Sequence, residues 1–217
     1  MQPRTLTTPK CMLEVAGRPF IAWLLEAIAG SGYERALICV GHLSRFVRQF
    51  VGNGSHFDLD VEYVEDGPVL LGTAGALRHA LGLLEPTFLA TYGDSYLPFD
   101  YALPLRDLDA HPDAEGCMSV FENKGQWDAS NTRVEGERVV SYEKGSQDPR
   151  ATFIDYGAMA LRREVIAALP PGELAGLDAV QADLARRGRL RACIAQERFY
   201  EIGSEEGLLA LEQRLSR

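Results

Sequence analysis

Hydrophobic positions in the first half of the chain alternate between a helical period and a strand-like period. After Pro19, the apolar residues Phe20, Leu24, Leu25 and Ile28 recur at helical spacing, and glycines then end the pattern. The alternation continues with a strand over 36–41, a helix over 42–54, a strand over 59–64, a helix over 72–85, and strands over 87–94 and 116–122. Alternating elements with short connections predict a mainly parallel sheet that carries helices on both faces.

The pattern becomes more mixed after Glu122. Two strand-like runs within 132–144 flank Gly136, which predicts an antiparallel hairpin. The sequence then predicts a strand over 152–161, a helix over 177–189, an extended segment over 190–203 and a helix over 204–216. Ser204 is the expected N-cap of this last helix. Because no repeat and no long linker divides the chain, we expect one α/β domain over 1–217.

The composition is that of a globular protein and excludes several kinds of partner. At 217 residues and 23.9 kDa, with 46% hydrophobic and 24% charged residues, the chain can bury a full core. It has 22 Lys and Arg against 31 Asp and Glu, and no block of basic residues, which argues against a nucleic-acid or membrane partner. No apolar run suffices for a membrane span or an export signal, so we expect a cytoplasmic protein.

The cysteines and histidines show no spacing typical of a metal or redox site. Cys11, Cys39, Cys117 and Cys193 lie far apart, without a CxxC pair, and we expect reduced and mostly buried thiols. The four histidines show no metal-binding pattern, so no zinc site is predicted.

Two places in the sequence are suited to binding a ligand. In open α/β sheets, ligands bind beyond the carboxyl ends of the strands, and the run over 87–94 ends on Asp94. A carboxylate there can hold Mg²⁺, or it can simply cap the following turn. The phrase GTAGAL, beginning at Gly72, puts two glycines at a helix start, where free N–H groups could bind an anion or a base edge. The same glycines could equally form no more than a tight turn.

Five phrases occur in order along the chain: TTPKCMLEVAGRPFI, LLGTAGAL, YGDSYL, YEKG and FYEIGSEEGL. Together they resemble the family that makes nucleotide-sugars, the sugar-1-phosphate nucleotidylyltransferases, over nearly the whole chain. Within that family the sequence is most similar to short bacterial mannose- or heptose-1-phosphate guanylyltransferases, which implies a place in cell-surface polysaccharide synthesis. The resemblance implies a three-layer, Rossmann-like and GT-A-like fold, with a nucleotide-binding part over 1–122 and a sugar-binding part over 123–217.

The resemblance also implies which residues carry the reaction. Lys10 would reach the phosphates at the reaction centre, Lys144 would hold the sugar phosphate, and Asp94 and Glu201 would bind Mg²⁺. A sugar-1-phosphate oxygen would attack the α-phosphorus of a nucleoside triphosphate, and pyrophosphate would leave. Because this nucleophile is already an anion, the site needs cations that overcome charge repulsion and align the phosphates, rather than a general base.

Substrate recognition is expected from two further sets of residues. The resemblance implies that the turn of Gly72, Thr73 and Gly75 faces the nucleobase, and that the sugar is bound by Glu143, Asp155 and Gly157. Glu65, at a strand end, could accept hydrogen bonds from the N1–H and N2–H₂ groups of guanine, or it could be a solvated acid. GTP is therefore the first expected donor, with UTP or CTP second.

The sequence departs from the family pattern at two points. Many members carry Asp where this chain has Glu201, whose extra methylene shifts a bound ion or the backbone. The family also begins with a strand and a glycine-rich phosphate loop before the PK phrase, and here Met1 precedes that phrase directly. We expect that the start codon was assigned too late, and that upstream in-frame codons encode an apolar strand and a glycine-rich loop ending in Arg.

Other functions fit part of the pattern. A glycosyltransferase with a related sheet commonly carries a DxD acid pair, whereas YGDSYL has one acid. A non-catalytic regulator that binds a nucleotide-sugar would keep the fold without turnover. The short N-terminus and Glu201 favour that alternative, and Lys10, Asp94 and Lys144 oppose it. A structural domain without a ligand is the third alternative.

Overall fold

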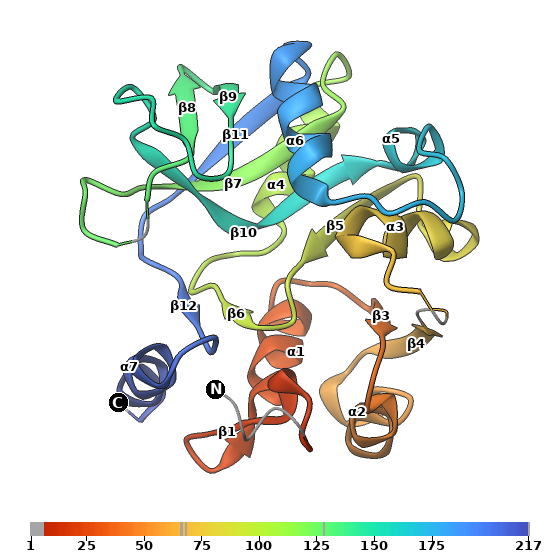
Figure 1. The fold of residues 1–217 in the computed structure, drawn as a ribbon. Coiled ribbons are helices and arrows are strands. Elements are labelled where there is room, and N and C mark those ends of the chain that lie inside the picture. Colours follow the sequence, from red (N-terminus) through yellow and green to blue (C-terminus); the bar gives the residue numbers. More distant parts are fainter. Residues whose placement is uncertain (1–6, 66, 68, 128, 217) are drawn as a thin grey trace. The chain divides into compact units, whose positions relative to one another are not determined.

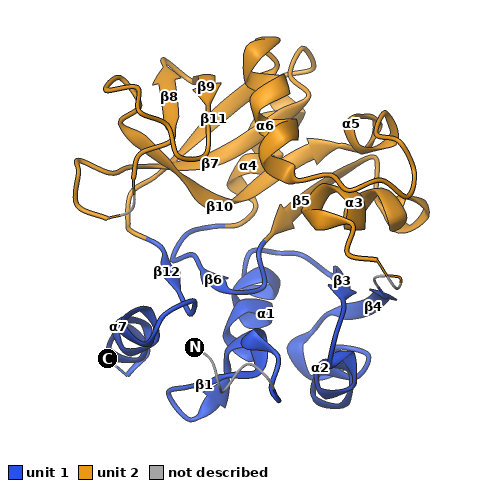
Figure 2. Ribbon diagram, viewed as in Figure 1, with its two compact units in different colours: residues 1–66, 92–100, 199–217 blue, residues 67–91, 101–198 orange. Residues whose placement is uncertain are grey.

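The computed structural model describes residues 7–65, 67, 69–127 and 129–216, and these form two compact units (Figure 2). Unit 1 comprises the described residues of 1–66, 92–100 and 199–217, and unit 2 those of 67–91 and 101–198. Neither unit is one continuous stretch of sequence. The boundary that the sequence suggested at residue 122 lies inside unit 2.

Unit 1 contains three helices and short paired strands among its described residues (Figure 1). These elements are β1 (Glu14–Val15), β2 (Arg18–Pro19), α1 (Phe20–Gly30), β3 (Arg35–Val40), α2 (Ser44–Val51), β4 (Asp60–Glu65), β6 (Ser95–Tyr96), β12 (Tyr200–Glu201) and α7 (Glu205–Leu215), with the 3₁₀ helices η2 (Lys10–Met12) and η3 (Ser55–Phe57). Strands β3 and β4 pair in parallel, whereas β1–β2 and β6–β12 are antiparallel pairs.

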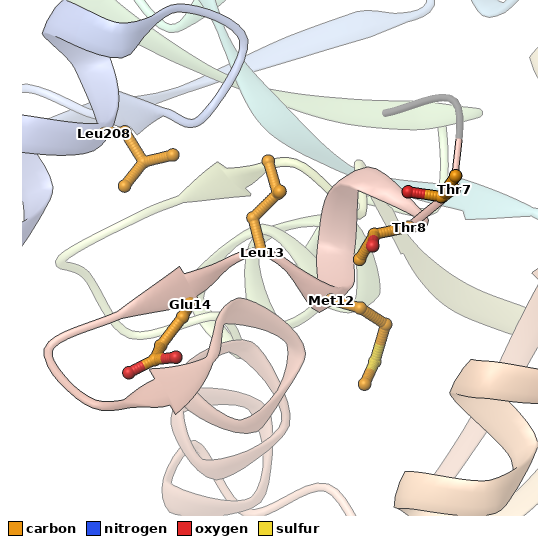
Figure 3. A pocket seen from close by; sticks show the side chains of 6 residues that line it. All are labelled: Thr7, Thr8, Met12, Leu13, Glu14 and Leu208. Atoms are coloured by element: carbon orange, nitrogen blue, oxygen red, sulfur yellow. The ribbon is translucent and has the colours of Figure 1, made fainter. Parts of the chain in front are cut away.

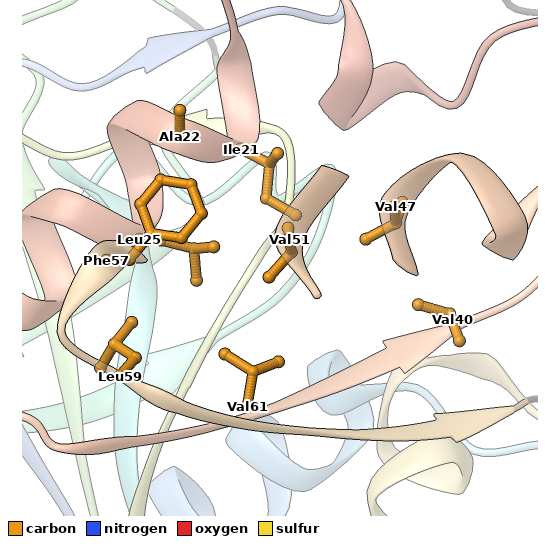
Figure 4. Close-up of a cluster of buried hydrophobic side chains, with 9 residues drawn as sticks. All are labelled: Ile21, Ala22, Leu25, Val40, Val47, Val51, Phe57, Leu59 and Val61. Carbon is orange, nitrogen blue, oxygen red and sulfur yellow. The ribbon is translucent and has the colours of Figure 1, made fainter. Parts of the chain in front are cut away.

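A cluster of buried apolar side chains joins α1, α2 and the β3–β4 pair (Figure 4). Ile21 and Leu25 of α1, and Val47 and Val51 of α2, are each four residues apart and therefore share one face of their helix. The cluster is completed by Ala22, Val40, Phe57, Leu59 and Val61. The helical spacing of apolar residues in the sequence thus corresponds to real buried faces.

The last helix of unit 1 is capped as the sequence predicted. Ser204 precedes α7, and its Oγ accepts a hydrogen bond of 3.0 Å from the N–H of Gly207. Glu205 and Glu206 lie in the first turn, where the helix dipole favours negative charge. This cap fixes the chain directly after β12, which carries Glu201.

Unit 2 is built on a six-stranded sheet with the strand order β5-β10-β7-β11-β9-β8 (Figure 1). Its elements are α3 (Gly72–His79), η4 (Leu81–Leu83), β5 (Thr87–Thr91), α4 (Leu103–Ala110), β7 (Gly116–Glu122), β8 (Thr132–Glu135), β9 (Arg138–Tyr142), β10 (Phe153–Arg162), α5 (Arg163–Ala167), α6 (Leu177–Arg186) and β11 (Leu190–Ala195). The predicted hairpin is confirmed, because β8 and β9 pair antiparallel around Gly136.

Helices α4 and α6 contact opposite faces of this sheet. Leu108 of α4 packs with Cys117 of β7 and Ala160 of β10, which face each other across the ladder. Leu184 of α6 approaches Gly116, the neighbour of Cys117, so α6 contacts the other face. Unit 2 therefore has the three-layer arrangement, helix–sheet–helix, that was expected.

The expectation of a mainly parallel sheet is wrong for the described strands. In the sheet of unit 2, β7–β11 is a parallel pair, whereas β5–β10, β10–β7, β11–β9 and β8–β9 are antiparallel. A strand that is buried on both faces of a sheet has no alternation of apolar and polar residues, whether its neighbours are parallel or antiparallel. Its short apolar run therefore does not reveal the direction of pairing.

Helix α4 was not predicted from the sequence.

The cysteines were expected to be reduced and mostly buried. Cys117 is buried, Cys11 and Cys193 are partly buried, and Cys39 is exposed. None of these four residues forms a disulfide bond. The strand and phosphate loop were expected upstream of Met1, and residues 1–6, which would follow them, lie outside the described residues. Within the described ranges, every helix is too short or too polar to span a bilayer.

Candidate functional site

Unit 1 brings two of the predicted catalytic residues into direct contact. The Nζ atom of Lys10 donates to Oδ2 of Asp94 at 2.9 Å, and both side chains are half-exposed. Lys10 begins η2, and Asp94 lies in the turn before β6, so the two come together from positions 84 residues apart. Burial raises the pKa of the neighbouring Cys11 thiol to about 11, which keeps that thiol neutral at physiological pH.

The predicted second metal ligand lies on the strand next to Asp94. Glu201 of β12 pairs with Ser95 of β6, and the N–H of Ile202 donates to the backbone oxygen of Asp94 at 3.0 Å. The ladder therefore keeps the backbones of Asp94 and Glu201 close to each other. The Nζ atom of Lys10 also lies beside Gly203, 3.8 Å from where a Cβ would be, which is an ordinary van der Waals distance.

The carboxylates of Asp94 and Glu201 are better suited to binding magnesium than zinc. Across the ranges that the structure describes, no group of three or more His, Cys, Asp or Glu residues could hold a metal ion. Zinc sites need three or four such ligands, whereas Mg²⁺ is commonly bound by one or two carboxylates together with water and substrate phosphates. The two carboxylates that were expected to bind metal, Asp94 and Glu201, would be a donor set of the second kind.

A hollow of about 370 Å³ lies beside the Lys10 segment within unit 1 (Figure 3). Its lining is mixed in polarity and consists of Thr7, Thr8, Met12, Leu13, Glu14 and Leu208. Neither Lys10 nor Asp94 lines it. The hollow therefore adjoins Lys10 in sequence without being lined by it.

Glu65, the predicted reader of guanine, already has partners within unit 1. Its Oε1 accepts from Nη2 of Arg48 at 3.2 Å and from Oγ of Ser44 at 3.5 Å. The Arg48 guanidinium also lies over the ring of Tyr63, 4.5 Å from its centroid. Since 62% of the Glu65 side chain is exposed, a base would meet a carboxylate that is reachable but paired with a cation.

The GTAG turn is held by a second segment of unit 2, which we call the 173–177 segment. The N–H groups of Ala74 and Gly75 both donate to the backbone oxygen of Ala175 at 3.0 Å, and the N–H of Ala175 donates to the oxygen of Leu71 at 2.8 Å. The Thr73 hydroxyl accepts from the N–H of Leu177, the first residue of α6, at 2.8 Å. Two amides at the start of α3 are therefore used inside the protein.

Both glycines of the turn face this segment. A Cβ at Gly72, whose φ is +73°, would lie 2.6 Å from the Ala175 oxygen, and one at Gly75 would lie 2.9 Å from the oxygen of Glu173. The tight turn, which the sequence left open as an alternative, thus accounts for the need for glycine. A base bound at this helix start would have to use the amides of Gly72 and Thr73.

Asp155, one of the residues expected to bind the sugar, lies where β10 departs from regular pairing. The register against β7 shifts between Asp155 and Met159, and Gly157 within this bulge has φ of +93°. Oδ1 of Asp155 accepts from the N–H of Gly157 at 2.9 Å, and Oδ2 accepts from Nε2 of Gln181 at 2.8 Å. As a residue Asp155 is only partly buried, but desolvation by the surrounding protein raises the pKa of its carboxyl.

Asn131 connects Asp155 to the predicted EK pair. Its Oδ1 accepts from the N–H of Asp155 at 3.1 Å, and its backbone oxygen accepts from the N–H of Glu143 at 2.9 Å. The side chains of Glu143 and Lys144 are exposed in the turn that follows β9. Unit 2 therefore links Glu143, Asp155 and Gly157 through Asn131, which the sequence did not indicate.

Gln181 was also missed by the sequence analysis. It lies on the apolar face of α6 and is 2% exposed. A buried polar residue inside a helical apolar pattern is the signal that could have singled it out, because such residues require a partner.

Comparison with known proteins places the fold. A mannose-1-phosphate guanylyltransferase of Mycobacterium tuberculosis is 30% identical over 190 residues, covering 79% of this chain and 48% of the relative. Other curated relatives are named uridylyl- and thymidylyltransferases. The chain spans about half the length of the guanylyltransferase and of the uridylyltransferases among these relatives. No protein-family model matches it.

Two solved structures resemble the chain over most of its length. A putative glucose-1-phosphate thymidylyltransferase from Bacillus anthracis superposes with a TM-score of 0.84 at 16% identity, covering 99% of this chain and 89% of that one. HddC from Yersinia pseudotuberculosis, complexed with GMP-PN, gives 0.77 at 21% identity, covering 96% and 90%. At these identities the likeness shows a shared α/β fold.

We predict that Gly72→Ala lowers the free energy of unfolding by about 2 kcal/mol or more, because the new Cβ meets both a positive φ and the Ala175 oxygen. Gly82→Ala is the matched control, since a Cβ there has nothing within 4 Å. Urea titration of both variants measures the difference. Equal stabilities would contradict the packing described for the turn.

We predict that Asp155→Asn weakens the pH dependence of stability. The folded-state pKa of Asp155 is raised above 3.8, so the wild type binds this proton more tightly when folded. Its stability contribution is thus present below the unfolded pKa and is lost as the pH rises through the folded value. In thermal unfolding experiments, the melting temperature should fall less between pH 4 and pH 8 for the variant than for the wild type. An equal fall in both proteins would show that the Asp155 carboxyl is not desolvated.

Proposed function

The chain is homologous to the sugar-1-phosphate nucleotidyltransferases, and from this premise we propose that it transfers a nucleotidyl group from a nucleoside triphosphate to a sugar 1-phosphate. The products are a nucleotide-sugar and pyrophosphate. The observation that supports this most directly is the contact of Lys10 with Asp94 in unit 1, because it joins the PK and GD phrases of the family pattern at one place.

In this reaction two anions must approach each other. The Lys10 ammonium would donate to phosphate oxygens at the α-phosphorus and offset the charge that develops there. Asp94 and Glu201 would hold Mg²⁺, which neutralises and aligns phosphates when bound. Asp94 also provides Lys10 with a counter-ion, so the half-exposed lysine is held at one place.

The sugar 1-phosphate is assigned to residues of unit 2. Glu143 and Asp155 carry carboxylates that can accept from sugar hydroxyls. Gly157 is buried, with its N–H bonded to Asp155 and its oxygen bonded to Thr91, so it would serve the sugar by shaping the bulge that carries Asp155. Lys144 is exposed beside Glu143 and supplies a cation for the sugar phosphate. Asn131, which bonds to both Asp155 and Glu143, keeps the two carboxylate-bearing segments in register.

GTP is the proposed donor, and a mannose or heptose 1-phosphate the proposed acceptor. The Mycobacterium tuberculosis relative is a guanylyltransferase, and HddC has been solved with GMP-PN. Glu65 can offer two acceptor oxygens to the N1–H and N2–H₂ edge of guanine, which uracil and thymine lack. The ion pair with Arg48 occupies Oε1, so reading guanine requires Arg48 to turn aside.

We predict pyrophosphate release when the protein is incubated with GTP, Mg²⁺ and mannose 1-phosphate, across a panel of four nucleoside triphosphates and several sugar 1-phosphates. Asp94→Asn should lower turnover roughly 100-fold or more while leaving the fold intact. Asp60→Asn, which changes an exposed acid of the same unit, is the control. If no combination releases pyrophosphate but nucleotide-sugars bind, the regulator alternative replaces this proposal.

We predict different kinetic defects for the two lysines. Lys144→Ala should mainly raise KM for the sugar 1-phosphate, whereas Lys10→Ala should lower kcat, because Lys10 is assigned to the phosphorus under attack. Lys124→Ala is the control, since this exposed lysine pairs with Glu122 and has no assigned role. Identical defects in Lys10→Ala and Lys144→Ala would show that the two roles are wrongly divided.

A further inference from the structure

The bulge of β10 is fixed from two sides by side chains of other elements. Nε2 of Gln181, on α6, donates to Oδ2 of Asp155 at 2.8 Å. On the other side, the hydroxyl of Thr91, at the end of β5, donates to the backbone oxygen of Gly157 at 3.0 Å. The irregular part of the strand is therefore held at both its carboxylate and its glycine.

We propose that Gln181 is a positioning residue that orients the Asp155 carboxylate for binding the sugar of a sugar 1-phosphate. This rests on the proposed function and deepens it. Gln181 is 2% exposed, whereas Asp155 is partly exposed. A ligand in solution can therefore contact the carboxylate of Asp155 but not the amide of Gln181. With Oδ1 tied to Gly157 and Oδ2 tied to Gln181, neither torsion of the Asp155 side chain is free to turn.

The cost of this arrangement argues against a purely structural role. An ionised carboxylate has no donor, so the amide of Gln181 must present its Nε2 to Asp155. Its Oε1 is then buried without a hydrogen-bond partner among the described residues. A buried unsatisfied acceptor typically costs about 1–3 kcal/mol, which Leu or Met at this position would avoid. Local conflicts of this kind are expected at functional sites.

The helix that carries Gln181 is itself fixed at its start. The Thr73 hydroxyl accepts from the N–H of Leu177, one helical turn before Gln181. Leu184, one turn further along α6 and 0% exposed, packs on Gly116 and not on Asp155. The start of the helix that carries the Gln181 amide is thus fixed by the GTAG turn.

The proposal is tested with Gln181→Met, which keeps the length and apolar packing of the side chain and removes its donor. Loss of a hydrogen bond to a charged group corresponds to about a tenfold rise in KM for the sugar 1-phosphate. KM for the nucleoside triphosphate should stay within about twofold, because the amide is assigned to the sugar side alone. Leu184→Ala is the control, since it destabilises α6 without touching Asp155, and it should change neither KM.

Amide hydrogen exchange of the ligand-free protein provides a readout that does not depend on activity. Exchange at the Gly157 amide, which bonds to Oδ1 of Asp155, should become faster in Gln181→Met than in Leu184→Ala at equal overall stability. Unchanged exchange at Gly157 overturns the positioning role. So does an equal rise in both KM values, or a rise in KM for the sugar 1-phosphate in Leu184→Ala.

The two readouts separate the two proposals. If Gly157 exchange rises in Gln181→Met while the wild type turns over no substrate, the proposed function fails and the sugar assignment fails with it, but the fixed carboxylate stands as an observation. If the wild type is active and Gln181→Met keeps its KM for the sugar 1-phosphate, the proposed function stands and this inference is refuted.

Discussion

The hydrogen bond between Gln181 and Asp155 connects parts of unit 2 that come from distant stretches of the sequence. It connects α6 to the bulge of β10, and through Asn131 the same bulge is connected to the turn that carries Glu143 and Lys144. At its other end, α6 begins on the hydroxyl of Thr73 in the GTAG turn. In a polar network of this kind each buried group left unpaired carries a desolvation cost, which here falls on Oε1 of Gln181.

The two predicted aspartates of the site lie in opposite environments. Asp94 is half-exposed and faces the ammonium of Lys10, an arrangement suited to exchanging one cation for another. Among the described residues, Asp155 is held by an amide and a backbone N–H rather than by a cation, and desolvation raises the pKa of its carboxyl. The environment of Asp94 is suited to binding a cation that contacts phosphates, and that of Asp155 is suited to hydrogen bonding with an uncharged sugar.

Much of this could be read from the sequence, and the limits have physical causes. The helices α1, α2, α3, α6 and α7 follow the apolar spacing, because each buries one face. Helix α4 was missed, since the segment LPLRDLDA is only 8 residues long and has a proline in its first turn. Strand direction was misjudged, since buried strands of both kinds appear in the sequence as apolar runs. The phrases located Lys10 and Asp94, whose contact the structure shows. Asn131 and Gln181 act through contacts between residues distant in sequence, which no local pattern records.

The central claim is that a sugar 1-phosphate attacks the α-phosphorus of a nucleoside triphosphate on this chain. The most direct test uses mannose 1-phosphate labelled with ¹⁸O at its three non-bridging phosphate oxygens, incubated with GTP, Mg²⁺ and the protein, with mass spectrometry of both products. Because the attacking oxygen belongs to the sugar phosphate, the account predicts a nucleotide-sugar that retains all three labels and a pyrophosphate that carries none. Label in the pyrophosphate, or unlabelled GMP as the main product, would contradict it.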